Sequence, residues 1–196
     1  TFNNTKTYNN MAQTATCPEI KDFLAANECL ENFGGLGVNV YVFLKSDLKA
    51  PLKAEKNVYS ALTSESFNTG KGLYKFECKE NSQGHTWESL GRRKGFKQQL
   101  DYVLESVNAA SAEVARGLNN LDLGYIVQDG EKNIIVYDPQ HKFEYASGGI
   151  KGDTGKKVDD DRMVELSGTL QPTTYGRYEI PAPESGWDSL LASKKA

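Results

Sequence analysis

The middle of the chain carries the clearest alternation of hydrophobic and polar positions. Over residues 96–104 a mostly apolar set (Phe96, Gln98, Leu100, Tyr102, Leu104) alternates with a mostly polar one (Lys97, Gln99, Asp101, Val103), which is the period of a strand with one buried face. Residues 107–121 instead repeat apolar positions every three or four residues, the period of a helix. Ser106 or Asn108 can cap this helix, because either side chain accepts from a first-turn amide. Next, Asp129-Gly130 lies between two β-branched runs and predicts a hairpin.

Shorter segments with the strand period lie on both sides of this central region. Strands are expected over residues 73–80, 86–90, 143–145 and 163–170. We therefore predict a mainly β fold with α, a β-sandwich or barrel of about seven or eight antiparallel strands flanked by one central helix. A short N-terminal helix is also expected, since Thr16-Cys17-Pro18-Glu19 has the cap, proline and acidic residue of a helix start.

The strand expected over residues 38–44 is apolar on both faces. Val40 and Val42 lie on one face, and Tyr41 and Phe43 lie on the other. Two explanations are open: the strand is covered on both sides by its own chain, or Tyr41 and Phe43 meet another subunit. As a hypothesis we adopt the second, and we take as candidate subunit-interface residues Tyr41, Phe43, Phe67 and Leu73.

Two stretches lack a regular pattern and are expected to form loops. Residues 45–71 are polar with irregularly spaced apolar residues, which predicts a projecting loop or hairpin. Structureless connections longer than about 12 to 15 residues are uncommon and are usually functional. The Gly- and Asp-rich residues 147–161 also predict a loop.

The pattern divides the chain into three regions. Residues 1–15 are expected to be an extended arm or a cloning remnant, because they are polar and rich in Asn and Thr. Residues 16–180 are expected to form a single β-sandwich or barrel domain, and residues 181–196 an extended tail. The apolar side chains with which this tail can dock are Trp187, Leu190 and Leu191.

Composition and charge limit the classes of partner. The chain has 196 residues, of which 38% are hydrophobic and 25% charged, as in an ordinary folded domain. The net charge of −3 gives no overall basic footprint for nucleic acid. The longest apolar run is far shorter than the ~20 residues that span a bilayer, so no membrane partner is expected. A leader peptide is not recognisable at the start, and a cytoplasmic protein is expected.

The cysteines and acidic residues do not form a recognisable metal site. Cys17, Cys29 and Cys78 are an odd number without a CxxC pair, which favours free thiols over a disulfide framework or a zinc site with His85. The run Asp159-Asp160-Asp161 lacks the alternating ligand spacing of a calcium loop. No metal and no cofactor are therefore expected.

Catalytic motifs are also lacking. No serine or cysteine lies in a nucleophile elbow that would present it to His85 or His141, so we do not expect an enzyme. The basic turn Arg92-Arg93-Lys94 is open to two interpretations, a solvated hairpin tip or a contact with phosphate or an acidic surface.

The order of elements resembles the major tail tube proteins of long-tailed bacteriophages and prophages, the superfamily that includes the tube of type VI secretion. The resemblance covers roughly residues 29–181. It rests on a Gly-rich turn into a strand (GGLGVNVYVFL), a long polar segment, the helix at 107–121, the strand pair DLGYIVQDGEKNIIVYD, and the terminal SGGIKGDTGKKVDDDRMVELSGTLQP. The residues before Met11 and the N-terminal helix depart from the family pattern.

This resemblance implies a structural virion protein. Its copies would form stacked hexameric rings whose sheets join into a β-lined channel, with DNA only as transported cargo and other phage tail proteins as further partners. The protein would be assembled in the host cytoplasm and reside in the virion tail. A mildly acidic channel would suit passage of a polyanion, because attraction would slow it. Residues 45–71 would reach the next ring.

Two other functions remain open from the sequence. A capsid decoration or head-tail joining protein would use the same small β fold in a single ring or as a monomer. A carbohydrate-binding module would gather aromatic side chains on one face, with the candidates Tyr145, Tyr175, Tyr178 and Trp187.

Overall fold

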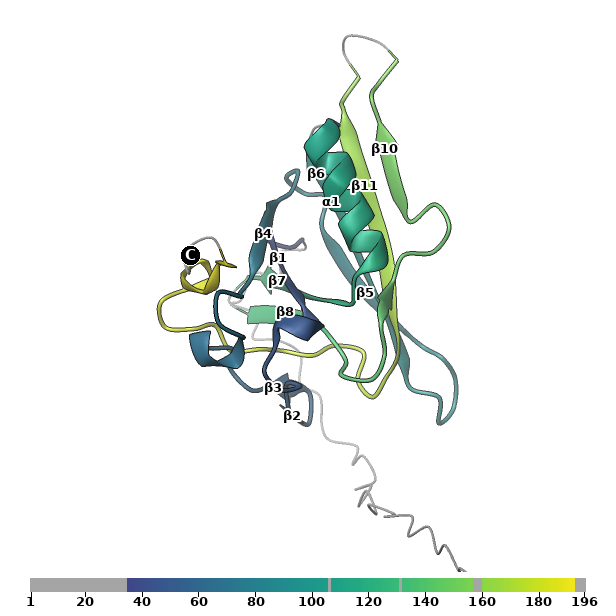
Figure 1. Cartoon of the computed structure of the whole chain (residues 1–196). Helices are drawn as coiled ribbons and strands as arrows, with labels where there is room; N and C mark the ends of the chain where they lie inside the picture. Colours follow the sequence, from purple (N-terminus) through teal and green to yellow (C-terminus); the bar gives the residue numbers. More distant parts are fainter. Residues whose placement is uncertain (1–34, 106, 131, 157–159, 193–196) are drawn as a thin grey trace, which may run out of the picture. The chain divides into compact units, whose positions relative to one another are not determined.

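The structure is a computed structural model that describes residues 35–105, 107–130, 132–156 and 160–192 (Figure 1). The chain divides into two units, Thr1–Phe33 and Gly34–Ala196. The expected N-terminal arm, the helix start at Thr16 and the cysteines Cys17 and Cys29 all lie outside the described residues. The fold described below belongs to the second unit.

The first sheet contains four antiparallel strands in the order β4-β1-β7-β8. They are β4 (Tyr74–Glu77), β1 (Asn39–Leu44), β7 (Leu123–Asp129) and β8 (Lys132–Val136). The predicted hairpin is confirmed, since β7 pairs with β8 from Tyr125↔Val136 to Asp129↔Lys132. Its turn contains Gly130 at φ +57°, a left-handed conformation that glycine adopts without strain.

The second sheet has the order β10-β11-β6-β5 (Figure 1). Its strands are β10 (Ile150–Asp153), β11 (Met163–Thr173), β6 (Phe96–Glu105) and β5 (Gly84–Ser89), and β9 (Phe143–Glu144) also pairs with β11. The predicted alternation along β6 is confirmed, because Gln98, Leu100 and Tyr102 are buried and their neighbours are less so. β10 corrects the loop expected over residues 147–161: its polar, Gly-containing sequence forms a strand because β11 pairs with it.

Side chains from both sheets share one hydrophobic core. Val40 and Tyr125 come from the first sheet, and Leu100 and Leu166 from the second. The chain also links the sheets directly after β4. There, the amide of Cys78 donates to Val38 O and the amide of Lys79 donates to Val103 O, each at 2.9 Å. The predicted mainly β fold with several antiparallel sheets and a central helix is confirmed.

Helix α1 (Ala109–Asn120) closes the side of this core beside the second sheet (Figure 1). Of the two expected caps, Ser106 lies outside the described residues, and Asn108 is observed at the helix start. Its side chain accepts from the amide of Ser111 at 2.9 Å, while the Ser111 hydroxyl accepts from the Asn108 amide at 2.8 Å. Leu118 is buried and Val114 packs against the core, as the helical period predicted.

For residues 45–71 the sequence predicts a projecting loop or hairpin; the structure contains a small hairpin there, but the segment packs against its own chain. They contain η1 (Lys45–Asp47), the small hairpin β2 (Ala54–Glu55) and β3 (Val58–Tyr59), and η2 (Ser64–Ser66). Most of their larger apolar side chains belong to a second hydrophobic cluster, namely Leu48, Leu52, Tyr59, Leu62 and Phe67, whereas Val58 is exposed. The described residues 45–71 therefore do not form an extended arm of the kind that could reach a neighbouring ring.

The C-terminal tail docks on the same cluster. Trp187 and Leu190, at the two ends of η3 (Trp187–Leu190), are buried, as the docking interpretation predicted. The indole Nε1 of Trp187 donates to Asn133 Oδ1 at 2.9 Å, so the ring is held by a hydrogen bond as well as by packing. The amide of Leu73 also donates to Leu190 O at 2.9 Å, which joins the tail to the start of β4.

Replacing Leu62 by alanine tests whether residues 45–71 belong to the core. Leu62 is 0% exposed, so Leu62→Ala should lower the free energy of unfolding by about 2 to 5 kcal/mol, measured by urea denaturation. Val58→Ala is the control, because Val58 lies in the same segment and is 43% exposed. It should change stability by less than about 0.5 kcal/mol, and equal small effects of both variants would contradict the packing described above.

Candidate functional site

The four candidate interface residues are buried by their own chain. Tyr41, Phe43, Phe67 and Leu73 are 5%, 0%, 1% and 1% exposed, and all belong to the second hydrophobic cluster. The Tyr41 hydroxyl donates to Asp188 Oδ1 at 2.9 Å, and the Phe43 ring lies 5.6 Å from that of Tyr137. Of the two explanations for the two-faced strand, cover by the same chain is the one observed. The argument that placed these side chains at a subunit interface was therefore wrong.

The outer face of the second sheet is instead polar and open. Cross-strand partners share a face, so the pairings Ser167↔Asp101 and Glu88↔Lys97 place all four side chains on this side of the sheet. The opposite face carries the core residues, among them Leu100 and Leu166. Within the described chain, the side chains of this polar face are exposed or half-buried, for example Glu165, Ser167, Gln99 and Lys97.

Acidic side chains predominate on this polar face. The strand registers place two ammonium groups on it, those of Lys97 and Lys151. The carboxylates that the same registers place there are those of Glu88, Asp101, Glu105, Glu144, Asp153 and Glu165. Lys97 Nζ is 2.9 Å from Glu88 Oε1, so one of the two cations is already paired. The face is therefore net negative.

Both edges of this sheet carry backbone groups that pair with no strand among the residues described. β5 pairs only with β6, and the outer side of β10 has no partner strand there. The amide of Ser167 donates to Gly149 O at 2.7 Å. Because hydrogen-bonded and non-hydrogen-bonded pairs alternate along an antiparallel ladder, the amides of Ile150 and Gly152 point outward from the edge.

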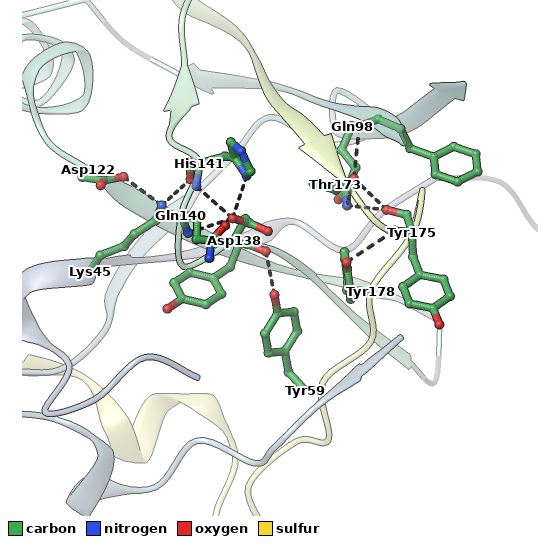
Figure 2. Close-up of polar contacts among 12 residues, drawn as sticks. Lys45, Tyr59, Gln98, Asp122, Asp138, Gln140, His141, Thr173, Tyr175 and Tyr178 are labelled. Carbon is green, nitrogen blue, oxygen red and sulfur yellow. Dashed lines mark hydrogen bonds and ion pairs between the residues drawn. The ribbon is translucent and has the colours of Figure 1, made fainter. Parts of the chain in front are cut away.

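A polar network joins three connections near one end of the sheets (Figure 2). Lys45 Nζ lies 3.0 Å from Asp122 Oδ1 and donates to His141 O. Asp138 Oδ1 accepts from the amides of Gln140 and His141 at 2.8 Å and lies 3.0 Å from His141 Nδ1. These contacts tie the end of β1 to the segments before β7 and after β8.

Three tyrosine hydroxyls meet inside the first core. Tyr145 Oη lies 2.8 Å from Tyr102 Oη and 2.7 Å from Tyr125 Oη, so it can donate to one and accept from the other. Burial raises the pKa of Tyr145 to about 12 and raises the pKa of Tyr102 and Tyr125 as well. The sequence shows tyrosines at these positions, but their meeting depends on how β6, β7 and the residue after β9 pack together.

The described residues offer little for catalysis or metal binding. Among them, no group of three or more His, Cys, Asp or Glu side chains is placed to hold a metal ion. Cys78 is a buried free thiol whose pKa is raised by burial to about 11, so it stays protonated at neutral pH. Burial lowers the pKa of His85, because it disfavours the charged imidazolium, and the Nε2 of this ring lies 3.3 Å from Gln98 Oε1.

The aromatic residues named for carbohydrate binding do not form one exposed surface. Tyr178 and Trp187 are buried in the second cluster, and Tyr145 belongs to the buried tyrosine group. Only Tyr175 of the four is exposed. As for membranes, the part of the chain covered by the structure contains no helix with the length and apolarity needed to cross a bilayer.

Removing the central hydroxyl of the tyrosine group tests its contribution to stability. Tyr145→Phe should lower the free energy of unfolding by about 1 to 3 kcal/mol, because two buried hydroxyls each lose a partner. Thermal and urea denaturation provide the measurement. Tyr74→Phe serves as control, since Tyr74 is 40% exposed, and a loss as large in this variant would show that the buried contacts are not the cause.

Alkaline pH should destabilise the folded chain through its buried tyrosines. Burial, aided by the contact with Asp188, raises the pKa of Tyr41 to about 12, and burial raises that of Tyr145 to the same value, from 10.0. Between pH 10 and 12 the unfolded chain releases protons that the folded chain retains, so the free energy of unfolding should fall as pH rises. Urea midpoints across this range test it. A decline that is no shallower in Tyr145→Phe would contradict the assignment.

Comparison with known proteins does not place the chain in a family. No family model, no curated protein and no solved structure matches it.

Proposed function

We propose that the chain is a structural virion protein whose copies assemble into stacked, hexameric rings and form a tail tube for DNA. The observation that carries this proposal is the open polar face of the second sheet, bounded by two unpaired edges within the described chain. A sheet of this kind provides a wall for a water-filled channel, because one face is anchored on a core and the other is already hydrophilic. Its partners are other copies of the chain and further tail proteins.

The fold class that we propose in detail is a β-sandwich or barrel flanked by α1. It is supported by the core that the two sheets share and by the crossing of the chain between them at Cys78 and Lys79. In such a body the second sheet contributes its inner face to stability and leaves its outer face for the channel.

The strand order allows the sheet to continue from one copy to the next. β10, β11, β6 and β5 alternate in direction, so β5 and β10 run antiparallel to each other. When β5 of one copy lies beside β10 of the next, the antiparallel alternation continues around the ring. The edge amides and carbonyls gain partners, which also protects them from non-specific aggregation.

The charge on the polar face is suited to passage of DNA rather than to its binding. Six carboxylates against two ammonium groups give each copy a negative surface there. Phosphate groups are repelled by such a surface, so a DNA strand gains no stable contact that would hold it in the channel. Repetition around a ring multiplies the effect.

A proline at the outer edge of β10 tests this mode of assembly. Gly152→Pro removes an outward-pointing amide, while a Cβ at this position meets only Val107 Cγ1, at 3.9 Å. We expect the variant to fold and to remain monomeric under conditions in which the unaltered chain forms rings or tubes. Size-exclusion chromatography with light scattering and negative-stain electron microscopy measure this.

Gly152→Ala is the matched control, because it adds a Cβ and keeps the amide. It should assemble like the unaltered chain. Tubes formed by Gly152→Pro would exclude joining through this edge. Single rings that never stack, even at high concentration, would instead favour the head-tail joining function.

A further inference from the structure

The basic turn between β5 and β6 has a fixed backbone. The amide of Leu90 donates to Gly95 O at 3.0 Å, and that of Lys94 donates to Gly91 O at 3.1 Å. Gly95 packs so closely on the end of β11 that a Cβ would lie 2.5 Å from Thr173 O. The turn therefore presents three consecutive exposed cations, Arg92, Arg93 and Lys94, from an anchored position.

A hollow of about 660 Å³ lies beside this turn. Hydrogen-bond donors line it from the segments that follow β8 and β11, including Gln140, His141 and Thr174. Asp138 is the one carboxylate in the lining, and its Oδ1 already accepts from two backbone amides (Figure 2). The hollow is thus rich in positive charge and in donors, which suits a phosphate group.

An exposed aromatic side chain, that of Trp87, packs against a residue that lines the hollow. Phe96 lines it, and the ring of Trp87 lies 5.5 Å from that of Phe96 at an interplanar angle of 79°. Three indole atoms of Trp87 lie over Gly176, where a Cβ would approach them to 2.5 Å, so one ring face is covered by backbone. Trp87 is nevertheless 55% exposed, which leaves the other ring face to solvent.

We infer that this surface binds single-stranded nucleic acid, with phosphates at Arg92, Arg93 and Lys94 and an unpaired base stacked on Trp87. Anchored cations beside an open aromatic ring are the combination by which proteins bind single strands without reading sequence. Trp87 pairs with Gln98 in the register and so lies on the opposite side of the sheet from Glu88 and the acidic face. The inference does not depend on ring assembly.

Tryptophan fluorescence provides the primary test. The chain contains two tryptophans, of which Trp87 is exposed and Trp187 is 3% exposed. Titration with a short oligothymidylate at low salt should quench the emission of Trp87. With three phosphate contacts, the logarithm of the binding constant should fall against the logarithm of salt concentration with a slope of about −2.

Two variants separate the phosphate and base contacts. Replacing Arg92, Arg93 and Lys94 together by glutamine should weaken binding at least about tenfold at low salt and remove most of the salt dependence. The control replaces Lys49, Lys53 and Lys56 by glutamine, which changes the net charge equally at exposed positions elsewhere. Trp87→Leu should weaken binding about tenfold while retaining the salt dependence.

Inorganic polyphosphate of matched charge is the competing probe. We expect it to bind more weakly than the oligonucleotide and without quenching Trp87. Equal affinity for polyphosphate together with no effect of Trp87→Leu would overturn the inference, since any polyanion would then suffice. An equal loss in the control variant would overturn it as well. Ring formation by the unaltered chain and by Gly152→Pro is measured separately, so failure of the tube proposal remains distinguishable from failure of this one.

Discussion

The fold depends on burying both faces of the first sheet. Along β1, Val40 and Val42 pack toward the second sheet, whereas Tyr41 and Phe43 pack in the opposite direction. The Phe43 ring packs directly on Gly124 of β7, so closely that a Cβ at this glycine would lie 2.3 Å from the ring. A sheet with two apolar faces requires two covering layers. The second sheet with α1 supplies one, and residues 45–71 with the C-terminal tail supply the other.

The way in which these two layers cover the first sheet determines which surfaces remain for interactions. Because the aromatic face of β1 is covered by the same chain, its burial contributes to stability and not to association. The second sheet has a core on one side only, so its other side keeps contact with water and is polar. Assembly through backbone groups at the edges of β5 and β10 then requires no exposed apolar patch, which is compatible with a chain that folds before it assembles.

Local patterns in the sequence predicted the elements whose character is set by neighbouring residues. The alternation along β6, the period and cap of α1 and the Asp129-Gly130 turn all have such local causes. The cover over β1 does not, because isolated residues such as Leu52 and Leu62 have no period and are buried only through distant contacts. For Tyr41 and Phe43, cover by the same chain and cover by another subunit produce the same sequence pattern. The polar positions of β6 and β11 are also apparent in the sequence. The strand register, which the sequence does not reveal, places them together on one acidic face.

The alternation of a single strand also separates two surfaces of opposite charge. In β5, Glu88 points to the acidic face beside Lys97, whereas the preceding residue Trp87 points to the other side and toward Phe96. A step of one residue along the chain thus leads from carboxylates that repel phosphate to an aromatic ring that packs on Phe96, which lines the same hollow as the three cations. The sheet lies between the two surfaces, and at physiological salt charges are screened over about 8 Å. The acidic face therefore weakens the attraction of a polyanion to the basic turn only a little. A chain with a net charge of −3 can therefore repel a polyanion along the outer face of a sheet and attract one at its basic turn.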